Sequence, residues 1–455
     1  MGGRLLAAGG AVRDYALASL GRLKGPLPES ADVDLVAFGV SFPELLEALE
    51  PWGLVRRILR REGGPEAPRT GLAALRRGRA RLEFSLPKGA PPEPGEHFGP
   101  AALFRDAAGR DFTVNAVYYD PLEDRLLDPL GGLADLREGR LRLCSPRAFR
   151  DDPVRMLRAM SLLARRPFAA GGDVLAAAGR HAGLLPGAPP ERSWREWRLL
   201  AESPRPHLGL TFLRDSGLLS AYPALDALRA LPQYRHFHPE GSVWNHSVLA
   251  VQAMSRIAPQ KGARRAVLSL AALLHDVGKT LAARSAQAKD GCPLVIYPDH
   301  AAKGVPVARE FLRSIGAPGA VVRAVTKLTA RHMDLAFKAF EPAVLRRTAR
   351  GLAPDADLAD FWAIVASDWN GRSPWPEKFP LSLEEFLEPV GGKTGAAPDL
   401  VTGRDILEAF GIGAGPEVGR LLKLAREATD DGRVSSREQA LACLAARLRG
   451  EEALG

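Results

Sequence analysis

The N-terminal third of the chain shows the apolar alternation of short strands together with helical periodicity. Apolar runs that favour β-strands occur at 35–40, 81–87 and 114–120, and a helical stretch occurs at 44–50. A loop rich in Pro and Gly is expected at 89–100. These patterns predict a small α+β domain built on a mixed or antiparallel sheet.

From Asp151 onward the periodicity is helical almost without interruption. We expect helices at 153–166, 191–203, 245–257, 265–279, 303–316 and 419–428. The segment 231–241, LPQYRHFHPEG, resembles a linker that opens a second helical unit. The predicted architecture is therefore an α/β head followed by a long all-α body.

Length and cysteine content limit the classes of protein that fit. A chain of 455 residues is long enough for about three domains. Its three cysteines, Cys144, Cys292 and Cys443, form no CxxC pair, which excludes a disulfide scaffold and a zinc ribbon and fits a reducing compartment. Polar residues interrupt the apolar N-terminus before a signal peptide or membrane span could form. We expect a cytoplasmic protein without membrane contact.

Charge is the first indication of a partner. The chain has 62 Lys and Arg against 53 Asp and Glu, a formal net charge of +9. Between residues 140 and 200, twelve Arg stand against five acidic residues. Clustered cations favour a polyanion such as RNA, and the alternative is a solvated helical face.

Two acidic residues begin the first predicted strand. Asp32 and Asp34 alternate along it, so both side chains project from one face with Cα atoms about 7 Å apart. Such a pair can hold two divalent cations for in-line phosphoryl transfer, and Glu83 on another strand is the candidate third carboxylate. Upstream, Gly9 and Gly10 allow backbone N–H groups to approach a triphosphate, and Arg13 could add charged donors.

Five blocks follow one another in an order that resembles the class II tRNA nucleotidyltransferase and bacterial poly(A) polymerase family. They are GGAVRD, DVD, GRDFTVNA, DDPVR and ER, beginning at Gly9, Asp32, Gly109, Asp151 and Glu191. The resemblance implies a polymerase β-type nucleotidyltransferase head that binds Mg²⁺ at Asp32 and Asp34. It also implies nucleotide contacts from Gly9, Gly10, Arg13, Arg110 and Asp111.

The DDPVR block can be interpreted physically as well. Asp151 or Asp152 can cap a helix that starts at Pro153, and Asp152 and Arg155 are neighbours on one helix face. An acceptor beside a donor matches the Watson–Crick edges of cytosine and adenine, and mismatched bases would leave buried groups unpaired. In the family the matching Asp and Arg select CTP and ATP, and Glu191 and Arg192 would join this nucleotide site.

A second set of residues resembles the HD phosphohydrolase superfamily. Histidines and aspartates occur in the order H, HD, H, H, D, with the string HDVGK, and such side chains suit Mn, Ni or Co. The resemblance implies a metal site at His246, His275, Asp276, His300, His332 and Asp368. It further implies hydrolysis of phosphomonoesters or 2′,3′-cyclic phosphates, with Lys279 available to the substrate phosphate. The implied domains are a head at 1–140, a neck at 141–230, an HD domain at 231–380 and a tail at 381–455.

The chain departs from the family pattern in three places. The stretch from Asp14 to Asp32 is longer than usual, which indicates an inserted loop. The stretch from Glu83 to Arg110 is shorter and lacks the expected Arg and Tyr, which is typical of relatives that add only CC. Gly109 replaces the first arginine of the usual RRD.

These observations favour an enzyme that adds C and A from CTP and ATP to the 3′ end of tRNA and releases pyrophosphate. A CC-adding enzyme is the first alternative. A poly(A) polymerase shares the head motifs but usually lacks an intact HD set and carries a basic tail. An RNA-binding protein with an inactive head is the alternative from another class, against which the retention of Asp32 and Asp34 speaks.

Overall fold

The computed structural model describes residues 3–23, 32–53, 56–61, 69–77, 80–88, 98–259, 262–287, 293–334, 341–372 and 379–449. The chain divides into two compact units, Met1–Tyr222 and Pro223–Gly455. The predicted loop at 89–100 lies largely outside the described residues, as does most of the insertion before Asp32. In the part of the chain that is described, none of the helices has the length and apolar character that crossing a bilayer requires.

The first unit contains a seven-stranded mixed sheet in the order β3-β4-β5-β2-β1-β6-β7. Strands β2 and β5 are parallel, and the other neighbours in this order are antiparallel. The strands span Arg4–Ala8 (β1), Asp32–Phe38 (β2), Arg56–Arg61 (β3), Arg69–Arg77 (β4), Ala80–Ser85 (β5), Tyr118–Asp120 (β6) and Arg125–Leu127 (β7). This agrees with the predicted mixed sheet, although Thr113–Asn115 forms a short 3₁₀ turn where the sequence suggested the start of a strand.

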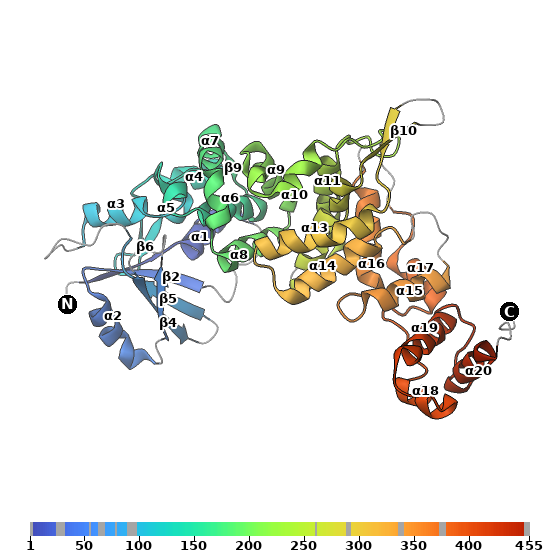
Figure 1. Ribbon diagram of the computed structural model, residues 1–455. Coiled ribbons are helices and arrows are strands. Elements are labelled where there is room, and N and C mark those ends of the chain that lie inside the picture. The colour runs from blue at the N-terminus through green and yellow to red at the C-terminus, as the bar shows by residue number, and fades with distance from the viewer. Residues whose placement is uncertain are drawn as a thin grey trace. The chain divides into compact units, whose positions relative to one another are not determined.

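Two apolar clusters hold the sheet between helices. Val36 and Phe38 of β2 pack on the side covered by α3 (Pro100–Ala108), and Ala37 packs on the side covered by α2 (Phe42–Leu49). Figure 1 shows α2 and α3 on opposite sides of the strands. Alternation therefore puts Asp32 and Asp34 on the same side as Val36 and Phe38.

The remainder of the first unit is helical, as predicted. The longer helices α6 and α8 pack together, and α6 also packs on α9. A parallel pair of two-residue strands, β8 (Arg140–Leu141) and β9 (Ala169–Ala170), interrupts this region. The helices are α1 (Gly10–Ser19), α4 (Gly132–Glu138), α5 (Ala148–Asp151), α6 (Val154–Arg165), α7 (Gly172–His181), α8 (Pro190–Ala201) and α9 (Pro206–Asp215).

The second unit is a helical bundle with a small tail. Helices α11 and α16, α12 and α14, and α13 and α14 pack in pairs, and the 3₁₀ turn η6 (Val277–Leu281) packs on α13. A hairpin of β10 (Arg284–Gln287) and β11 (Pro293–Ile296) is a second exception to the predicted all-α body, after β9. The bundle helices are α10 (Pro223–Asp226), α11 (Val243–Ile257), α12 (Ala263–Leu274), α13 (His300–Ser314), α14 (Gly319–Arg331), α15 (Pro342–Leu352), α16 (Leu358–Asn370) and α17 (Leu383–Leu387).

The last three helices have a core of their own. Val401, Ile406, Leu421 and Leu444 are buried together between α18 (Gly403–Phe410), α19 (Pro416–Asp430) and α20 (Arg437–Leu448). Arg350 of α15 donates twice to the carboxylate of Asp430, each at 2.9 Å, which attaches this tail to the bundle.

Candidate active site of the head and metal centre of the helical unit

The two strand aspartates lie at the start of β2, which is an inner strand of the sheet. Both side chains are exposed. In the parallel pairing of β2 with β5, Asp34 lies opposite Glu83, so adjacent strands bring two predicted site residues side by side. On the other side of β2, Asp34 lies opposite Ala8, at the end of β1 that leads into α1.

Gly9 places Asp34 against the start of α1. The glycine has a φ of 75°, and a Cβ there would lie 2.5 Å from Oδ2 of Asp34. Only a residue without a side chain permits both this backbone and this approach. Among the described residues, no side chain caps the N-terminus of α1, so backbone N–H groups are available there beside the carboxylate.

The electrostatic environment of Asp34 fits a cation. Although solvent reaches the carboxylate, the surrounding protein atoms raise its pKa, as does the nearby Glu83, while Arg110 opposes them. Among the described residues, sets of three ligands close enough to share one ion occur only in the second unit, and Glu83 lies 2.7 Å from Arg81. Mg²⁺ commonly takes one or two carboxylates and completes its shell with water and substrate phosphates. Asp32 and Asp34 fit that role without Glu83.

Arg13 is held inside the head. Its guanidinium donates to Asp14 at 2.8 Å and to Asn115 at 2.7 Å, and the residue is only 7% exposed. Asp14 also accepts from Arg166, which follows α6, at 2.9 Å. The predicted triphosphate contact from Arg13 would therefore require this network to open. Arg13 as placed joins α1 to Asn115 of the head, and Asp14 joins α1 to Arg166 of the neck.

The GRD block builds a second buried network. Arg110 donates to Asp106 at 2.9 Å and to the Tyr118 hydroxyl at 3.0 Å. Asp111 accepts from Arg158 of α6 at 2.9 Å. Burial raises the pKa of Asp111, but Arg158 lowers it well below its ordinary value. The role of Arg158 was missed from sequence because it becomes visible only when α6 packs on the head.

The predicted template residues meet at the start of α6. Asp152 accepts from the Val154 N–H at 3.2 Å, as a capping residue does, and from Arg192 at 2.5 Å. Arg155 donates to the carbonyl oxygen of Gly109 at 2.7 Å and lies 3.8 Å from Asp152. The predicted partner Glu191 is exposed in the first turn of α8.

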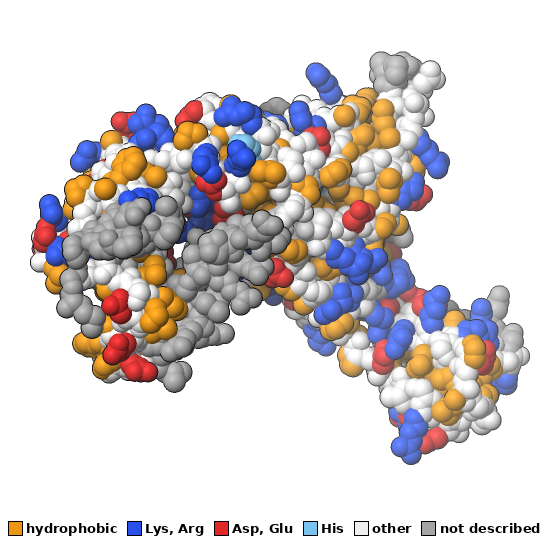
Figure 2. Space-filling view, turned by 60° about the vertical axis from the view of Figure 1, so that its left-hand side comes forward, with side chains coloured by type: hydrophobic (Ala, Val, Ile, Leu, Met, Phe, Trp, Pro, Cys, Tyr) orange, Lys and Arg blue, Asp and Glu red, His pale blue; other side chains and the backbone are white. Residues whose placement is uncertain are grey.

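Many of the clustered arginines of the neck are engaged within the protein. Arg140 and Arg142 pair with Asp135, and others pair with Asp14, Asp111 and Asp152. Exposed cations remain at Arg150, Arg180 and Arg195. Figure 2 shows basic side chains spread over the visible face, with acidic side chains beside many of them. Many arginines of the predicted basic cluster thus pair with acids of the first unit while remaining partly exposed.

In the second unit, all six predicted metal ligands come together from five elements. Asp276 lies at the centre, with Oδ1 3.2 Å from His300 Nε2 and Oδ2 3.4 Å from His275 Nε2. His246 Nε2 lies 2.9 Å from Asp368 Oδ1. The ligand atoms form two groups, one of His246, His275 and Asp368 and one of Asp276, His300 and His332.

The histidine orientations fit a metal. In His275, His300 and His332, Nδ1 lies 2.8 to 2.9 Å from the backbone carbonyl oxygen three residues earlier. A carbonyl only accepts, so Nδ1 carries a proton, and in the neutral ring Nε2 is a lone pair. The Nε2 atoms of His300 and His332 face each other at 3.1 Å, and among the described residues nothing hydrogen-bonds to the buried Nε2 of His275. Nε2 atoms that face one another beside a carboxylate fit a divalent cation between them.

Asp276 lies between the two ligand groups. Its Oδ1 faces His300 of one group, and its Oδ2 faces His275 of the other. Burial raises the pKa of Asp276, but Lys279 and His275 lower it far below its ordinary value. Lys279 donates to Asp276 Oδ2 at 2.6 Å and to Gln233 at 2.7 Å. The carboxylate is therefore ionised and placed to bridge two ligand groups.

Glu240 was missed by the sequence analysis. Its Oε1 lies 2.7 Å from Nδ1 of His246 and 2.9 Å from Nδ1 of His238. Burial raises its pKa, but the two histidines lower it to about 2, so it is a carboxylate at neutral pH. Burial lowers the pKa of His246, whereas Asp368 and Glu240 raise it to about 9. The acid in the string HPEG, before the first predicted ligand, was the available signal.

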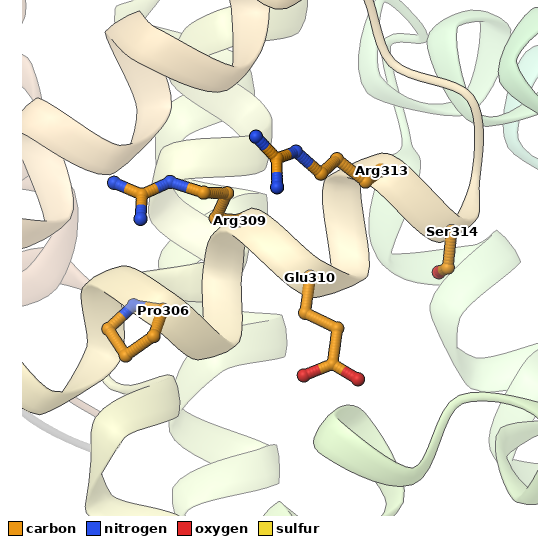
Figure 3. Close-up of a pocket in the computed structure, with 5 residues that line it drawn as sticks. All are labelled: Pro306, Arg309, Glu310, Arg313 and Ser314. Atoms are coloured by element: carbon orange, nitrogen blue, oxygen red, sulfur yellow. The ribbon is translucent and has the colours of Figure 1, made fainter.

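A separate surface pocket lies on the C-terminal half of α13. It is lined by Pro306, Arg309, Glu310, Arg313 and Ser314. Figure 3 shows Arg309 and Arg313 on one side of the helix and Glu310 directed away from them. None of the predicted site residues lines it, so it belongs to neither site described above.

Known protein families match the parts of the chain that contain most residues of these two sites. Residues 5–142 match the Poly A polymerase head domain, and residues 243–360 match the HD domain. A multifunctional CCA protein of Xanthomonas campestris is 32% identical over 71% of this chain and 77% of its own length. A CC-adding tRNA nucleotidyltransferase of Thermus thermophilus is 31% identical over 89% of each chain.

Solved structures share the fold over nearly the whole length. The Bacillus stearothermophilus CCA-adding enzyme in complex with CTP superposes with a TM-score of 0.63 at 20% identity, covering 99% of this chain and 94% of that one. The Thermotoga maritima CCA-adding enzyme complexed with tRNA has a TM-score of 0.56 at 17% identity, covering 98% and 92%. The chain belongs to the tRNA nucleotidyltransferase and poly(A) polymerase family and carries an HD domain after its nucleotidyltransferase head.

Proposed function

We propose that the head adds C and A to the 3′ end of tRNA from CTP and ATP, with release of pyrophosphate. The observation that carries the proposal is the position of Asp34 between the start of α1 and Glu83. Relatives named as CCA proteins and solved CCA-adding enzymes with CTP or ATP support it. The expected partners are tRNA, CTP and ATP.

The head residues have distinct tasks in this proposal. Asp32 and Asp34 would hold Mg²⁺, which when bound would supply positive charge to stabilise the reacting phosphate. Backbone N–H groups at Gly9 and Gly10 bind the triphosphate. Arg110 adds positive charge beside Asp34.

Asp152 and Arg155 form the base-selecting pair. Arg155 is fixed by the carbonyl of Gly109, so its remaining N–H groups point from a defined position. Asp152 is held by Arg192 and shares a helix start with Arg155. An incoming cytosine or adenine would take over part of the Asp152 hydrogen bonding, and a base with the reversed pattern would leave that acceptor unpaired.

A CC-adding enzyme is the second candidate function. The short stretch between Glu83 and Arg110 favours it, and so does the Thermus thermophilus relative. The test incubates the protein with tRNA transcripts that end before CCA, or after CC, together with CTP, ATP or both, and identifies the nucleotides added. Addition of C, C and A supports the full enzyme, C alone supports the CC-adding form, and long A tails support a poly(A) polymerase. RNA binding without product supports an inactive head.

For the helical unit, we propose phosphoester hydrolysis at a pair of transition-metal ions such as Mn, Ni or Co. The residues of the two ligand groups, with Asp276 between them, would hold the ions, which when bound would supply an activated water. Lys279 stands beside Asp276 as a cation for the substrate phosphate. The substrates expected are phosphomonoesters and 2′,3′-cyclic phosphates.

Paired variants test the assignment of two sites. Asp34→Ala should abolish nucleotide addition and leave hydrolysis of a cyclic phosphate intact. His275→Ala should do the opposite. If both activities disappear together in variants whose circular dichroism matches that of the wild type, the division into two sites is wrong.

A further inference from the structure

The segment Leu231–Gly241, expected from sequence to be a linker, is a closed loop in the second unit. The Gln233 N–H donates to the Gly241 carbonyl oxygen at 2.8 Å, and the Val243 N–H donates to the Leu231 carbonyl oxygen at 3.0 Å. These bonds join the two ends of the segment. A loop closed at its base holds its tip in a defined place.

Both ends of this loop contact residues of the metal centre. At one end, Gln233 accepts from Lys279, the cation that contacts Asp276. At the other end, His238 and Glu240 lie against His246. The loop therefore begins beside one part of the ligand set and ends beside another. Only four residues, 234–237, separate Gln233 from His238, so the tip is attached on both sides to residues that contact the centre.

The tip presents aromatic and basic side chains. The rings of Tyr234, His236 and Phe237 lie 4.9 to 5.9 Å apart between centroids. Phe237 is 52% exposed, and Arg235 and His236 are also exposed. The N–H groups of Phe237 and His238 both donate to the Tyr234 carbonyl oxygen, which turns the chain tightly at this point.

An exposed aromatic cluster beside a phosphate site matches one kind of ligand well. Nucleobases stack on aromatic rings, and arginine adds cation–π and phosphate contacts, as in the recognition of single-stranded RNA ends. A simple phosphomonoester has no group that would use these rings. On the basis of the proposed hydrolase function, we propose that this loop binds the terminal base of an RNA or nucleotide whose 3′-phosphate or 2′,3′-cyclic phosphate occupies the metal centre.

The test compares ligands with and without a base on the full-length protein. Adenosine 3′-phosphate and inorganic phosphate are titrated into the metal-loaded protein by calorimetry. Phe237→Ala should weaken binding of adenosine 3′-phosphate about tenfold relative to inorganic phosphate, and Phe237→Trp should restore it. Leu448→Ala removes another exposed apolar side chain of the same unit and serves as the matched control.

Kinetics provide a second measurement. With adenosine 2′,3′-cyclic phosphate, Phe237→Ala should raise KM about tenfold with a much smaller change in kcat, because the ring binds the base and not the reacting phosphate. Equal affinity of wild type and Phe237→Ala for adenosine 3′-phosphate, or no measurable binding by the wild type, would overturn the inference. Absence of hydrolysis with preserved, Phe237-dependent binding would instead reject only the proposed hydrolase function.

Discussion

Glu240 Oε1 lies 2.7 Å from Nδ1 of His246, on the side of the imidazole opposite to Asp368. A carboxylate in this position favours a proton on Nδ1. A metal would therefore bind at Nε2 in place of the second proton, which the raised pKa of His246, about 9, keeps on the ring at neutral pH. The carboxylate also prevents rotation of the ring. Glu240 is thus a positioning residue for the first ligand of the metal centre.

Replacement of this carboxylate should weaken metal binding. We expect Glu240→Gln to reduce the affinity for Mn²⁺ or Co²⁺ by about 10- to 100-fold, because the ring loses its charged partner. Metal content after dialysis and the visible spectrum of the Co²⁺ form measure the effect. Glu310→Gln, at an exposed position of α13, is the control and should bind metal normally. Unchanged affinity in Glu240→Gln would remove the positioning role.

Gly9→Ala should damage the head. The new Cβ would stand 2.5 Å from Asp34 Oδ2, on a backbone with positive φ that costs an L-residue about 1 to 2 kcal/mol. We expect urea denaturation to show a loss of at least that size in the free energy of unfolding. Gly10→Ala is the matched comparison, since its Cβ would meet its first neighbour at 3.6 Å. Equal stability of the two variants would contradict the placement of Asp34.

Gly278 fixes the distance between the HD turn and α13. A Cβ on this residue would lie 2.0 Å from the His300 carbonyl oxygen and 2.3 Å from the Gly304 nitrogen. Gly278→Ala should push η6 away from α13, separate Asp276 from His300 and lower metal affinity by more than tenfold. Gly319→Ala, where the nearest atom is 3.6 Å away, should leave metal content unchanged. The metal content of both purified variants tests this prediction. Equal metal content in Gly278→Ala and Gly319→Ala would contradict it.

Asp111 makes the stability of the first unit depend on pH. Pairing with Arg158 holds the pKa of Asp111 in the folded state below its ordinary value, which is about 4. The free energy that this pairing adds to folding is therefore complete above about pH 4, and it declines as the pH falls below that. At pH 7, Asp111→Asn should cost about 2 kcal/mol, less than a fully buried pair because Arg158 is 39% exposed.

Urea titrations at pH 7, 5 and 3 measure this dependence. The difference between wild type and Asp111→Asn should be constant from pH 7 to 5 and should narrow by about 1 kcal/mol at pH 3. Asp215→Asn, at an exposed position, should show no such narrowing. A difference that grows on acidification would have the wrong sign for a depressed carboxyl pKa.

Local patterns in the chain accounted for much of the architecture. Strand alternation placed Asp32 and Asp34 on one face, and helical periodicity located α6, α8, α11, α13 and α19 to within a few residues. These features depend on neighbours along the chain, and the mixed sheet and helical body were predicted correctly for that reason. The helix predicted at 265–279 ends earlier, at Leu274 of α12, and the HD pair lies in the turn before η6. Elements that were not predicted include the strands β1, β3, β4, β7, β8 and β9, the hairpin β10–β11 and the head helices α1, α3 and α4. Several of these are short or rich in arginine and alanine.

Partners far apart in the chain could not be assigned in the same way. Arg158 pairs with Asp111, 47 residues earlier, and Arg166 with Asp14, 152 residues earlier. Nothing in the sequence indicated that these arginines of the basic cluster also form ion pairs within the first unit. Likewise, the role of Glu240 as a partner of His246 cannot be inferred from the sequence. It depends on the packing that brings His246 against Asp368, 122 residues later in the chain. Whether a charged side chain binds a ligand or holds the fold depends on which opposite charge packing brings within about 3 Å, and spacing along the chain carries no information about that distance.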